Sequence, residues 1–349
     1  MRRGGKILFG AILLGILFAL LAYYFVTSEK QENKNENQHI QAQNNPYFDN
    51  PLSIEFQRNK KYPGSTIKIE QTLAPGTNYQ QYIASYNSDG LKIYGLLAIP
   101  NGPVPKDGYP AIIFNHGYIP PEEYRTTERY VAYFADLANE GYVVFKPDYR
   151  GHGDSEGKPE GAYFSPGYTT DVMNALSTIE KMPQVNKKKM GMWGHSLGGF
   201  LTLRALVLTH DIKAAVIWGG VVGSYKDMSE EWWSKRRVPS FTPSQRELQS
   251  NRPSRQNFTN KYGQPADTPF WNAISATTYL NDITAPIQLH HGLSDETVPP
   301  QLSQILKDKL TKIGKPVELY TYEGTDHNIS QSFSLAMSRT IKFFDTYLK

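Results

Sequence analysis

The sequence predicts an α/β protein built around a mostly parallel sheet. After Gly108, short apolar runs alternate with amphipathic stretches of helical period, which is the pattern of βαβ units. Each run ends in a loop that carries Gly, His, Asp or Ser, and open α/β sheets bind their ligands at these ends. One run, residues 190–193, leads through a glycine-rich turn around Ser196 into an apolar helix.

The length and composition of the chain indicate the size of its folded part and exclude several kinds of chemistry. The chain has 349 residues, of which 39% are hydrophobic, which is enough for one large domain or two small ones with a sizeable core. Because it contains no cysteine, it has no disulfide, thiol nucleophile or zinc-thiolate site. Its net charge of +4, without a long basic run, does not indicate nucleic acid binding. Nothing in the sequence indicates an oligomeric state.

The first 26 residues have the pattern of a membrane anchor. Residues 7–26 are uncharged and mostly apolar, and as a helix they are long enough to span a bilayer. The basic flank of residues 1–6 predicts a cytoplasmic N-terminus and an extracytoplasmic remainder. The alternative is a cleaved signal peptide and a secreted protein. The stretch is longer than a usual signal core and lacks a clear A-x-A site, so we expect an uncleaved, single-pass anchor in the cell membrane.

The chain then changes from a polar tether to a folded domain. Residues 27–50 are rich in Asn, Gln, Lys and Glu and predict a disordered linker. Residues 51–349 form the predicted domain, which opens with three alternating, antiparallel segments. The expected strands are residues 66–72, 80–86, 91–99, 111–114, 142–145, 189–193, 214–218, 287–290 and 317–322. The expected helices are residues 129–139, 170–181, 197–208, 301–312 and 332–347.

The turn around Ser196 has the form of a nucleophile elbow. Residues 194–198 read Gly-His-Ser-Leu-Gly, the G-x-S-x-G pattern, with a further glycine at 199. A strand that turns sharply into a helix needs residues without side chains beside the serine. The turn would expose the Ser196 hydroxyl as a nucleophile. It would also place the Leu197 amide at a helix N-terminus, where it can donate to an oxyanion.

A nucleophilic serine needs a base, and the base needs an orienting acid. His327 is the predicted base because it is the histidine that follows both an acid loop and the last strand. Asp295, after the strand 287–290, is the predicted acid, with Glu296 and Asp326 as poorer alternatives. An N-cap would also explain Asp295 alone, but the three loops occur in the expected order.

Three further loops complete the prediction. The loop after the strand 111–114 should supply the second oxyanion donor, the amide of Tyr118, unless it only completes a turn. Asp148 and Arg150 are expected to pair in a structural turn at the rim of the site. His290 and His291 are expected to form a buried turn pair and not a metal site, since no third ligand is suitably spaced.

An insertion of about residues 221–275 is predicted to form a helical cap over the pocket. It holds six aromatic side chains of Trp and Phe, some of which would pack on the core. Between residues 224 and 261, eight Lys or Arg outnumber four Asp or Glu. A solvated basic surface explains this excess, and an anionic substrate is the alternative.

From about Tyr133 to the C-terminus, the chain resembles the catalytic domain of the prolyl oligopeptidase (S9) family of serine peptidases, within the α/β-hydrolase superfamily. Four blocks carry the resemblance: ANEGYVVFKPDYRGHGDSEG, MGMWGHSLGGFLTLRAL, APIQLHHGLSDETVPPQ and GKPVELYTYEGTDHNI. The resemblance implies Ser196 as nucleophile, Asp295 as acid and His327 as base. It also implies a three-layer fold around an eight-stranded sheet.

Two departures from that family bear on the activity. Large members carry a β-propeller before the catalytic domain, and the expected anchor and tether leave no room for one here. Where those peptidases commonly have an aromatic residue after the serine, this chain has Leu197, and GHSLGG is equally typical of esterases and lipases. We therefore predict a serine hydrolase of small peptide or ester substrates that needs no metal or organic cofactor. The alternatives are a carboxylesterase or acyltransferase without peptidase activity and, as the weakest, a non-catalytic binding protein.

Overall fold

A computed structural model of the chain describes residue 24 and residues 46–234 and 255–349. The predicted anchor and tether lie outside these residues, except for Tyr24 and residues 46–50. Within the described ranges, no helix has the length and apolarity needed to cross a membrane. Residues 51–349 make up one compact unit.

A nine-stranded sheet forms the centre of this unit, in the order β1-β2-β3-β5-β4-β6-β7-β8-β9. The strands β4 to β9 are mutually parallel, while β1, β2 and β3 form antiparallel pairs and β3 joins β5 antiparallel. The strands are β1 (Lys68–Thr72), β2 (Tyr79–Ser88), β3 (Leu91–Pro100), β4 (Tyr109–Asn115), β5 (Val143–Pro147), β6 (Val185–His195), β7 (Ile212–Trp218), β8 (Ile287–Gly292) and β9 (Val317–Tyr322).

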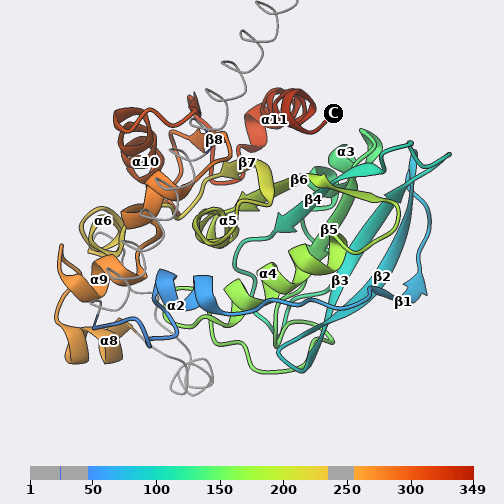
Figure 1. Cartoon of the computed structure of the whole chain (residues 1–349). Helices are drawn as coiled ribbons and strands as arrows, with labels where there is room; N and C mark the ends of the chain where they lie inside the picture. Colours follow the sequence, from blue (N-terminus) through green and yellow to red (C-terminus); the bar gives the residue numbers. More distant parts are fainter. Residues whose placement is uncertain (1–23, 25–45, 235–254) are drawn as a thin grey trace, which may run out of the picture. The chain divides into compact units, whose positions relative to one another are not determined.

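The sheet has the nine strands that the sequence pattern predicts, which is one more than the eight that the family resemblance implies. The additional strand comes from the antiparallel start, where β1 pairs with β2 at the edge of the sheet. Four of the five β1 residues are exposed, so this strand is held by backbone pairing and not by a buried face. The mostly parallel α/β architecture is as predicted (Figure 1).

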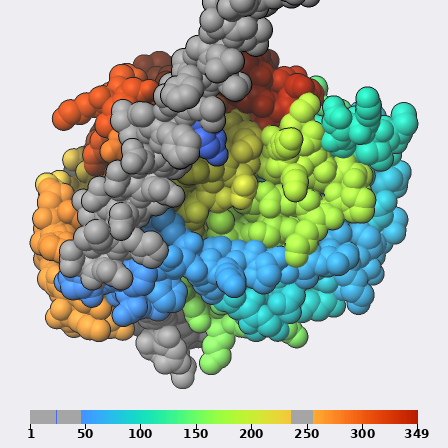
Figure 2. Space-filling model, viewed as in Figure 1, coloured from blue at the N-terminus to red at the C-terminus, as the bar shows by residue number. Residues whose placement is uncertain are grey.

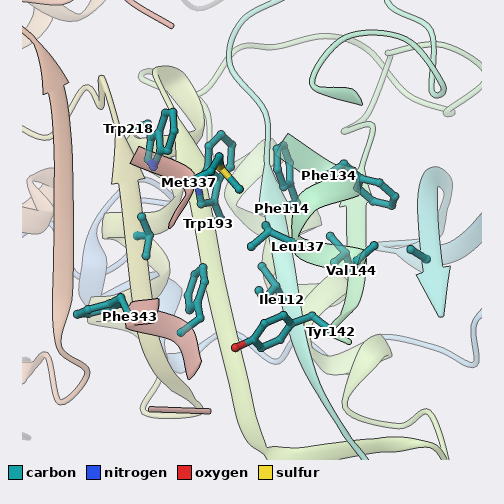
Figure 3. Close-up of a cluster of buried hydrophobic side chains, with 14 of the residues drawn as sticks. Ile112, Phe114, Phe134, Leu137, Tyr142, Val144, Trp193, Trp218, Met337 and Phe343 are labelled. Carbon is teal, nitrogen blue, oxygen red and sulfur yellow. The ribbon is translucent and has the colours of Figure 1, made fainter. Parts of the chain in front are cut away.

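Helices cover both faces of the sheet. On one face, α3 (Val131–Asn139) and α11 (Phe333–Leu348) contribute to a continuous apolar core with strands β4 to β7. Figure 3 shows this core, with Phe134 and Leu137 of α3 facing Ile112 and Phe114 of β4. On the opposite face, α5 (Leu197–Leu208) packs on β4, β6 and β7, and α4 (Gly167–Ile179) packs beside it.

The remaining elements flank these layers. The helix α10 (Gln301–Lys312) packs on β8 and β9. The expected cap region contains α6 (Tyr225–Met228), a π-helical turn (Ser229–Trp233), α8 (Arg255–Tyr262) and α9 (Pro269–Ile274), and its residues 235–254 are outside the described part. The segment from α2 (Ile54–Asn59) to β1 runs as a blue band across one face, from the orange α8 and α9 to the cyan strands (Figure 2).

Candidate active site

Ser196 occupies the sharp turn between β6 and α5. Its backbone has φ 56° and ψ −119°, a strained conformation for a residue with a side chain. Three backbone hydrogen bonds hold it: Ser196 N–H donates to Trp218 O at 3.0 Å, and Ser196 O accepts from Gly199 and Val221 at 2.9 and 3.1 Å. A Cβ atom on Gly198 would lie 1.9 Å from the Asn115 carbonyl oxygen, so only glycine lets α5 approach β4 this closely.

Asp295 and His327 are brought together by the loops after β8 and β9. The His327 Nδ1 lies 2.6 Å from Asp295 Oδ2, while Asp295 Oδ1 accepts from the backbone amides of Thr297 and Val298 at 2.8 and 2.9 Å. Because a carboxylate accepts this bond, the proton of a neutral His327 is on Nδ1, which leaves Nε2 free to accept one.

The environment of Asp295 favours its charged form. Burial raises the pKa of this carboxyl, but hydrogen bonds from His291 and His327 outweigh burial and hold the pKa well below its usual range. Of the two alternative acids, Asp326 accepts from the amide and the hydroxyl of Ser330 at 2.8 and 2.9 Å. No hydrogen bond within the described ranges joins Glu296 to His327.

His291 is a second histidine that contacts Asp295, and the sequence did not predict this contact. Its Nε2 donates to Asp295 Oδ2 at 3.1 Å and to Val298 O at 3.0 Å, while its Nδ1 accepts from the Ser303 hydroxyl at 2.7 Å. Both His290 and His291 are fully buried, as predicted, but they lie inside β8 and do not form a turn. Neighbouring residues of a strand face opposite sides of the sheet, so only His291 meets Asp295.

The two predicted oxyanion donors lie at the ends of neighbouring parallel strands. Leu197 is the first residue of α5, where the amides have no intrahelical acceptor. Tyr118 follows β4, and its amide has no acceptor among the residues that the structure describes, while its side chain is 59% exposed. The loop comes close to the serine, since a Cβ on Gly117 would lie 3.1 Å from the Ser196 Cβ.

A chain of hydrogen bonds connects the Tyr118 loop to the His327 loop. The Gly117 N–H donates to the Tyr130 hydroxyl at 2.9 Å, and this hydroxyl lies 2.7 Å from His195 Nδ1. The His195 Nε2 donates to the His327 carbonyl at 3.0 Å. Burial lowers the pKa of His195 to about 3, so the ring is neutral near pH 7. Tyr130 belongs to no recognisable motif, and its role depends on tertiary contacts.

Ser196, Leu197, Tyr118 and His327 line one pocket of about 490 Å³. Much of the remaining wall is aromatic, and it includes Trp232 from the region that we expected to form a cap. The other lining residues are Gly117, Ile119, Arg129, Tyr130, Tyr133, Tyr163, His195, Thr297 and Asn328. Within the described part of the chain, no cluster of three or more His, Asp or Glu is arranged to hold a metal ion.

The predicted pair of Asp148 and Arg150 does not form. The Arg150 guanidinium binds Asp171 of α4 through two hydrogen bonds of 2.7 and 3.0 Å. Asp148 accepts instead from the hydroxyls of Tyr124 and Thr126 at 2.7 and 2.5 Å. The prediction failed because Asp171 lies in a helix 21 residues further along, where only the packing of α4 on the sheet brings it to Arg150.

Comparison with known proteins gives a family match over most of this unit. The family model described as "Prolyl oligopeptidase family" matches residues 128–349. The uncharacterized peptidase YtmA of Bacillus subtilis is 29% identical over 73% of this chain and 88% of its own length. YuxL, a second uncharacterized peptidase of that organism, is 28% identical over 70% of this chain but only 35% of its own length. This chain therefore spans about a third of the larger relative.

Solved structures with a similar fold include both peptidases and esterases. A Mycobacterium tuberculosis puromycin-hydrolyzing peptidase has a TM-score of 0.61 at 19% identity, over 78% of this chain and 40% of that one. An acetyl xylan esterase from Paenibacillus sp. R4 has a TM-score of 0.61 at 18% identity, over 84% of this chain and 92% of that one. At these identities the likeness shows the fold, which is that of the α/β-hydrolases.

Proposed function

The chain belongs to the prolyl oligopeptidase family of serine hydrolases, and we propose that it cleaves peptide or ester bonds of small substrates through an acyl-enzyme on Ser196. The observation that carries the proposal is the pair of His327 and Asp295, joined at 2.6 Å, on the pocket that Ser196 lines. A serine with a base and an orienting acid at one pocket is the arrangement needed for acyl transfer.

In the proposed reaction, His327 Nε2 takes the proton of the Ser196 hydroxyl as its oxygen attacks the substrate carbonyl. Asp295 stabilises the imidazolium that forms, which is why its charged form matters. The Leu197 and Tyr118 amides donate to the oxyanion of the tetrahedral intermediate. His327 then gives the proton to the leaving amine or alcohol, and water releases the acyl group by the same steps.

We further propose that residues 221–275 act as a cap that limits the size of the substrate. The position of Trp232 in the pocket wall supports this role, since its indole N–H donates to Thr297 O at 2.7 Å and so links the region to the acid loop. Aromatic walls of this kind bind flat or apolar groups of a substrate.

The test of the activity is steady-state turnover by the full chain, purified in mild detergent. An anilide and a nitrophenyl ester with the same acyl group report peptidase and esterase activity separately. We expect Ser196→Ala to reduce kcat by at least about 10⁴-fold, since the serine forms the covalent bond. Ser338→Ala, at an exposed position on α11, is the matched control. Equal turnover by Ser196→Ala and the wild type would disprove the proposal.

A covalent probe adds a readout that does not depend on the choice of substrate. A fluorophosphonate should label the wild type on the peptide that contains Ser196, and it should not label Ser196→Ala. Labelling of another serine would assign the nucleophile elsewhere.

We also propose that residues 7–26 anchor the enzyme in the cell membrane with the hydrolase domain outside. The uncharged length of this segment and its basic flank support the proposal. In intact cells, external protease should digest the hydrolase domain, and the protein should stay in the membrane fraction after alkaline extraction. A mature N-terminus beyond residue 26 would instead establish a cleaved signal peptide.

A further inference from the structure

Arg129 contributes a positively charged side chain to the wall of the active-site pocket. Its side chain is exposed, and the residue lines the same pocket as Ser196 and His327. None of the described lining residues is Asp or Glu, and Arg129 is the one Lys or Arg among them. In the described part of the chain, the guanidinium forms no ion pair. This charge is therefore available to a ligand.

The backbone at Arg129 is strained in the way that is common at binding sites. Arg129 and Tyr130 both have positive φ, at 57° and 54°, directly before α3 begins at Val131. Two successive non-glycine residues in the left-handed region cost on the order of 1 kcal/mol each. The Tyr130 hydroxyl is held between Gly117 and His195, so the strained turn is fixed against the catalytic loops.

Arg129 is next to Tyr130, which connects the loops around the pocket. Burial raises the pKa of the Tyr130 hydroxyl, and the hydrogen bond from the Gly117 amide and the charge of Arg129 partly oppose this effect. The same hydroxyl bonds to Gly117 of the predicted oxyanion loop. An anion bound to Arg129 would therefore lie in the same pocket as Ser196, with the aromatic rings of Tyr133 and Trp232 also in the pocket wall.

We propose that Arg129 binds a carboxylate of the substrate, so that the enzyme acts on esters or amides that carry a free acid group. This inference rests on the proposed hydrolysis at Ser196. A guanidinium binds a carboxylate through two parallel hydrogen bonds, which fixes its orientation as well as its charge. A substrate with an ammonium group at the same position is disfavoured, because the described lining has no carboxylate to receive it.

Two series of nitrophenyl esters test this inference, since the carboxylate can belong to either side of the scissile bond. In the first series, 4-nitrophenyl benzoates carry a para methyl, carboxylate or aminomethyl group. In the second series, nitrophenyl acetates carry the same three groups on the leaving phenol. In at least one series, we expect kcat/KM to be about tenfold higher for the carboxylate than for the methyl ester.

The variants separate the charge of Arg129 from its other effects. Arg129→Gln should bring the ratio of carboxylate to methyl ester to about one, and Arg129→Lys should keep part of the preference. Arg125→Gln is the matched control, because it removes an exposed arginine four residues away that does not line the pocket. Increasing the salt concentration should also weaken the preference. A preference that survives in Arg129→Gln would overturn the inference.

Binding to Ser196→Ala distinguishes the two proposals. This variant holds the esters without turning them over, so calorimetry measures their affinity directly. Tighter binding of the carboxylate esters, lost when Arg129→Gln is added, supports the inference even if the wild type hydrolyses none of them. Turnover of the methyl ester without any carboxylate preference, in both series and in binding, would refute the inference and leave the proposed hydrolysis standing.

Discussion

Among single residues, the Tyr130 hydroxyl stands out because it connects the two loops that take part in the proposed reaction. Because the His195 Nε2 donates to the His327 carbonyl, its Nδ1 has no proton and must accept. The Tyr130 hydroxyl therefore donates to His195 and accepts from the Gly117 N–H. Tyr130 thus contacts the loop of Tyr118 through Gly117 and the loop of His327 through His195, and we propose that it positions both.

Tyr130→Phe should lower kcat more than it affects KM. The change leaves the Gly117 amide and the His195 Nδ1 without their partner, and the oxyanion loop can then shift away from Ser196. Since oxyanion contacts form mainly in the transition state, we expect kcat to fall about 10- to 100-fold with KM within about twofold. Steady-state kinetics on an uncharged ester measure both values.

Tyr86→Phe is the control for this prediction. It removes the same atom from a buried tyrosine whose hydroxyl donates to Asp171 O at 2.8 Å, away from the pocket. This variant should lose stability and keep kcat. If Tyr130→Phe also kept kcat, or only raised KM, the positioning role would be wrong.

The residues of the candidate site show which of its contacts a sequence can predict and which it cannot. Ser196, Asp295 and His327 each follow a strand in a recognisable order, so the topology alone predicts that they meet. His291 and Tyr130 carry no such signal, because a hydrogen bond to a side chain depends on packing between distant segments. The strand that begins at Ile287 was predicted, and β8 extends it from residue 290 to Gly292, but the contact of His291 with Asp295 was not predicted.

Among the strands and helices, the spacing of hydrophobic residues predicted the bounds well where one face of the element is buried. The helix α5 begins and ends at the predicted residues, 197 and 208. The largest differences are at strand ends rich in polar residues, as in β6, which begins at Val185 and not at residue 189. Polar side chains there are exposed, so only the pairing of β6 with its neighbours defines the strand.

One buried cation connects α5 to the segment before the sheet. The Arg204 side chain, 1% exposed, donates to Leu52 O at 2.6 Å, to Gln57 Oε1 at 2.8 Å and to Ile274 O at 2.7 Å. It thereby joins α5 to both α2 and α9. A sequence gives no sign of this, since an arginine on a helix is ordinarily exposed.

Arg204→Met should destabilise the protein by about 3 kcal/mol or more. The methionine fills much of the volume but leaves three buried acceptors without a donor. The free energy of unfolding in urea measures the loss. Arg58→Met is the comparison, because this half-exposed arginine donates to Val207 O and Asp282, and its loss should cost about 1 kcal/mol. Equal losses in the two variants would contradict the proposed importance of burial.

Three buried imidazoles should make the stability of the folded protein depend on pH. Burial lowers the pKa of His195 and of His290 to about 3, and it holds the pKa of His116 well below its usual range. In the unfolded chain each has a pKa of about 6.5. Between these values the unfolded chain binds protons that the folded protein does not, so these groups reduce stability as pH falls below 6.5.

Buried carboxyl groups act in the opposite sense. Burial raises the pKa of Asp148 to about 6 and that of Glu180 to about 7, and it also raises the pKa of Asp136 and Asp171. The folded protein binds these protons before the unfolded chain does, which favours folding as pH falls. Glu180 is only partly buried, so solvent screening reduces its contribution.

The three imidazoles outweigh the carboxyl groups between pH 6.5 and pH 5. In this window the unfolded chain binds about one proton more than the folded protein. The free energy of unfolding should therefore decrease by about 1.4 kcal/mol for each unit by which the pH falls. The urea midpoint should therefore be lower at pH 5.0 than at pH 6.5, and a constant or rising midpoint would contradict this balance.

His290→Gln tests the assignment, because it removes one titrating imidazole whose partners, Tyr322 and Gln288, lie outside the pocket. Its midpoint should fall less steeply than that of the wild type, since the folded and unfolded states then differ by one proton fewer.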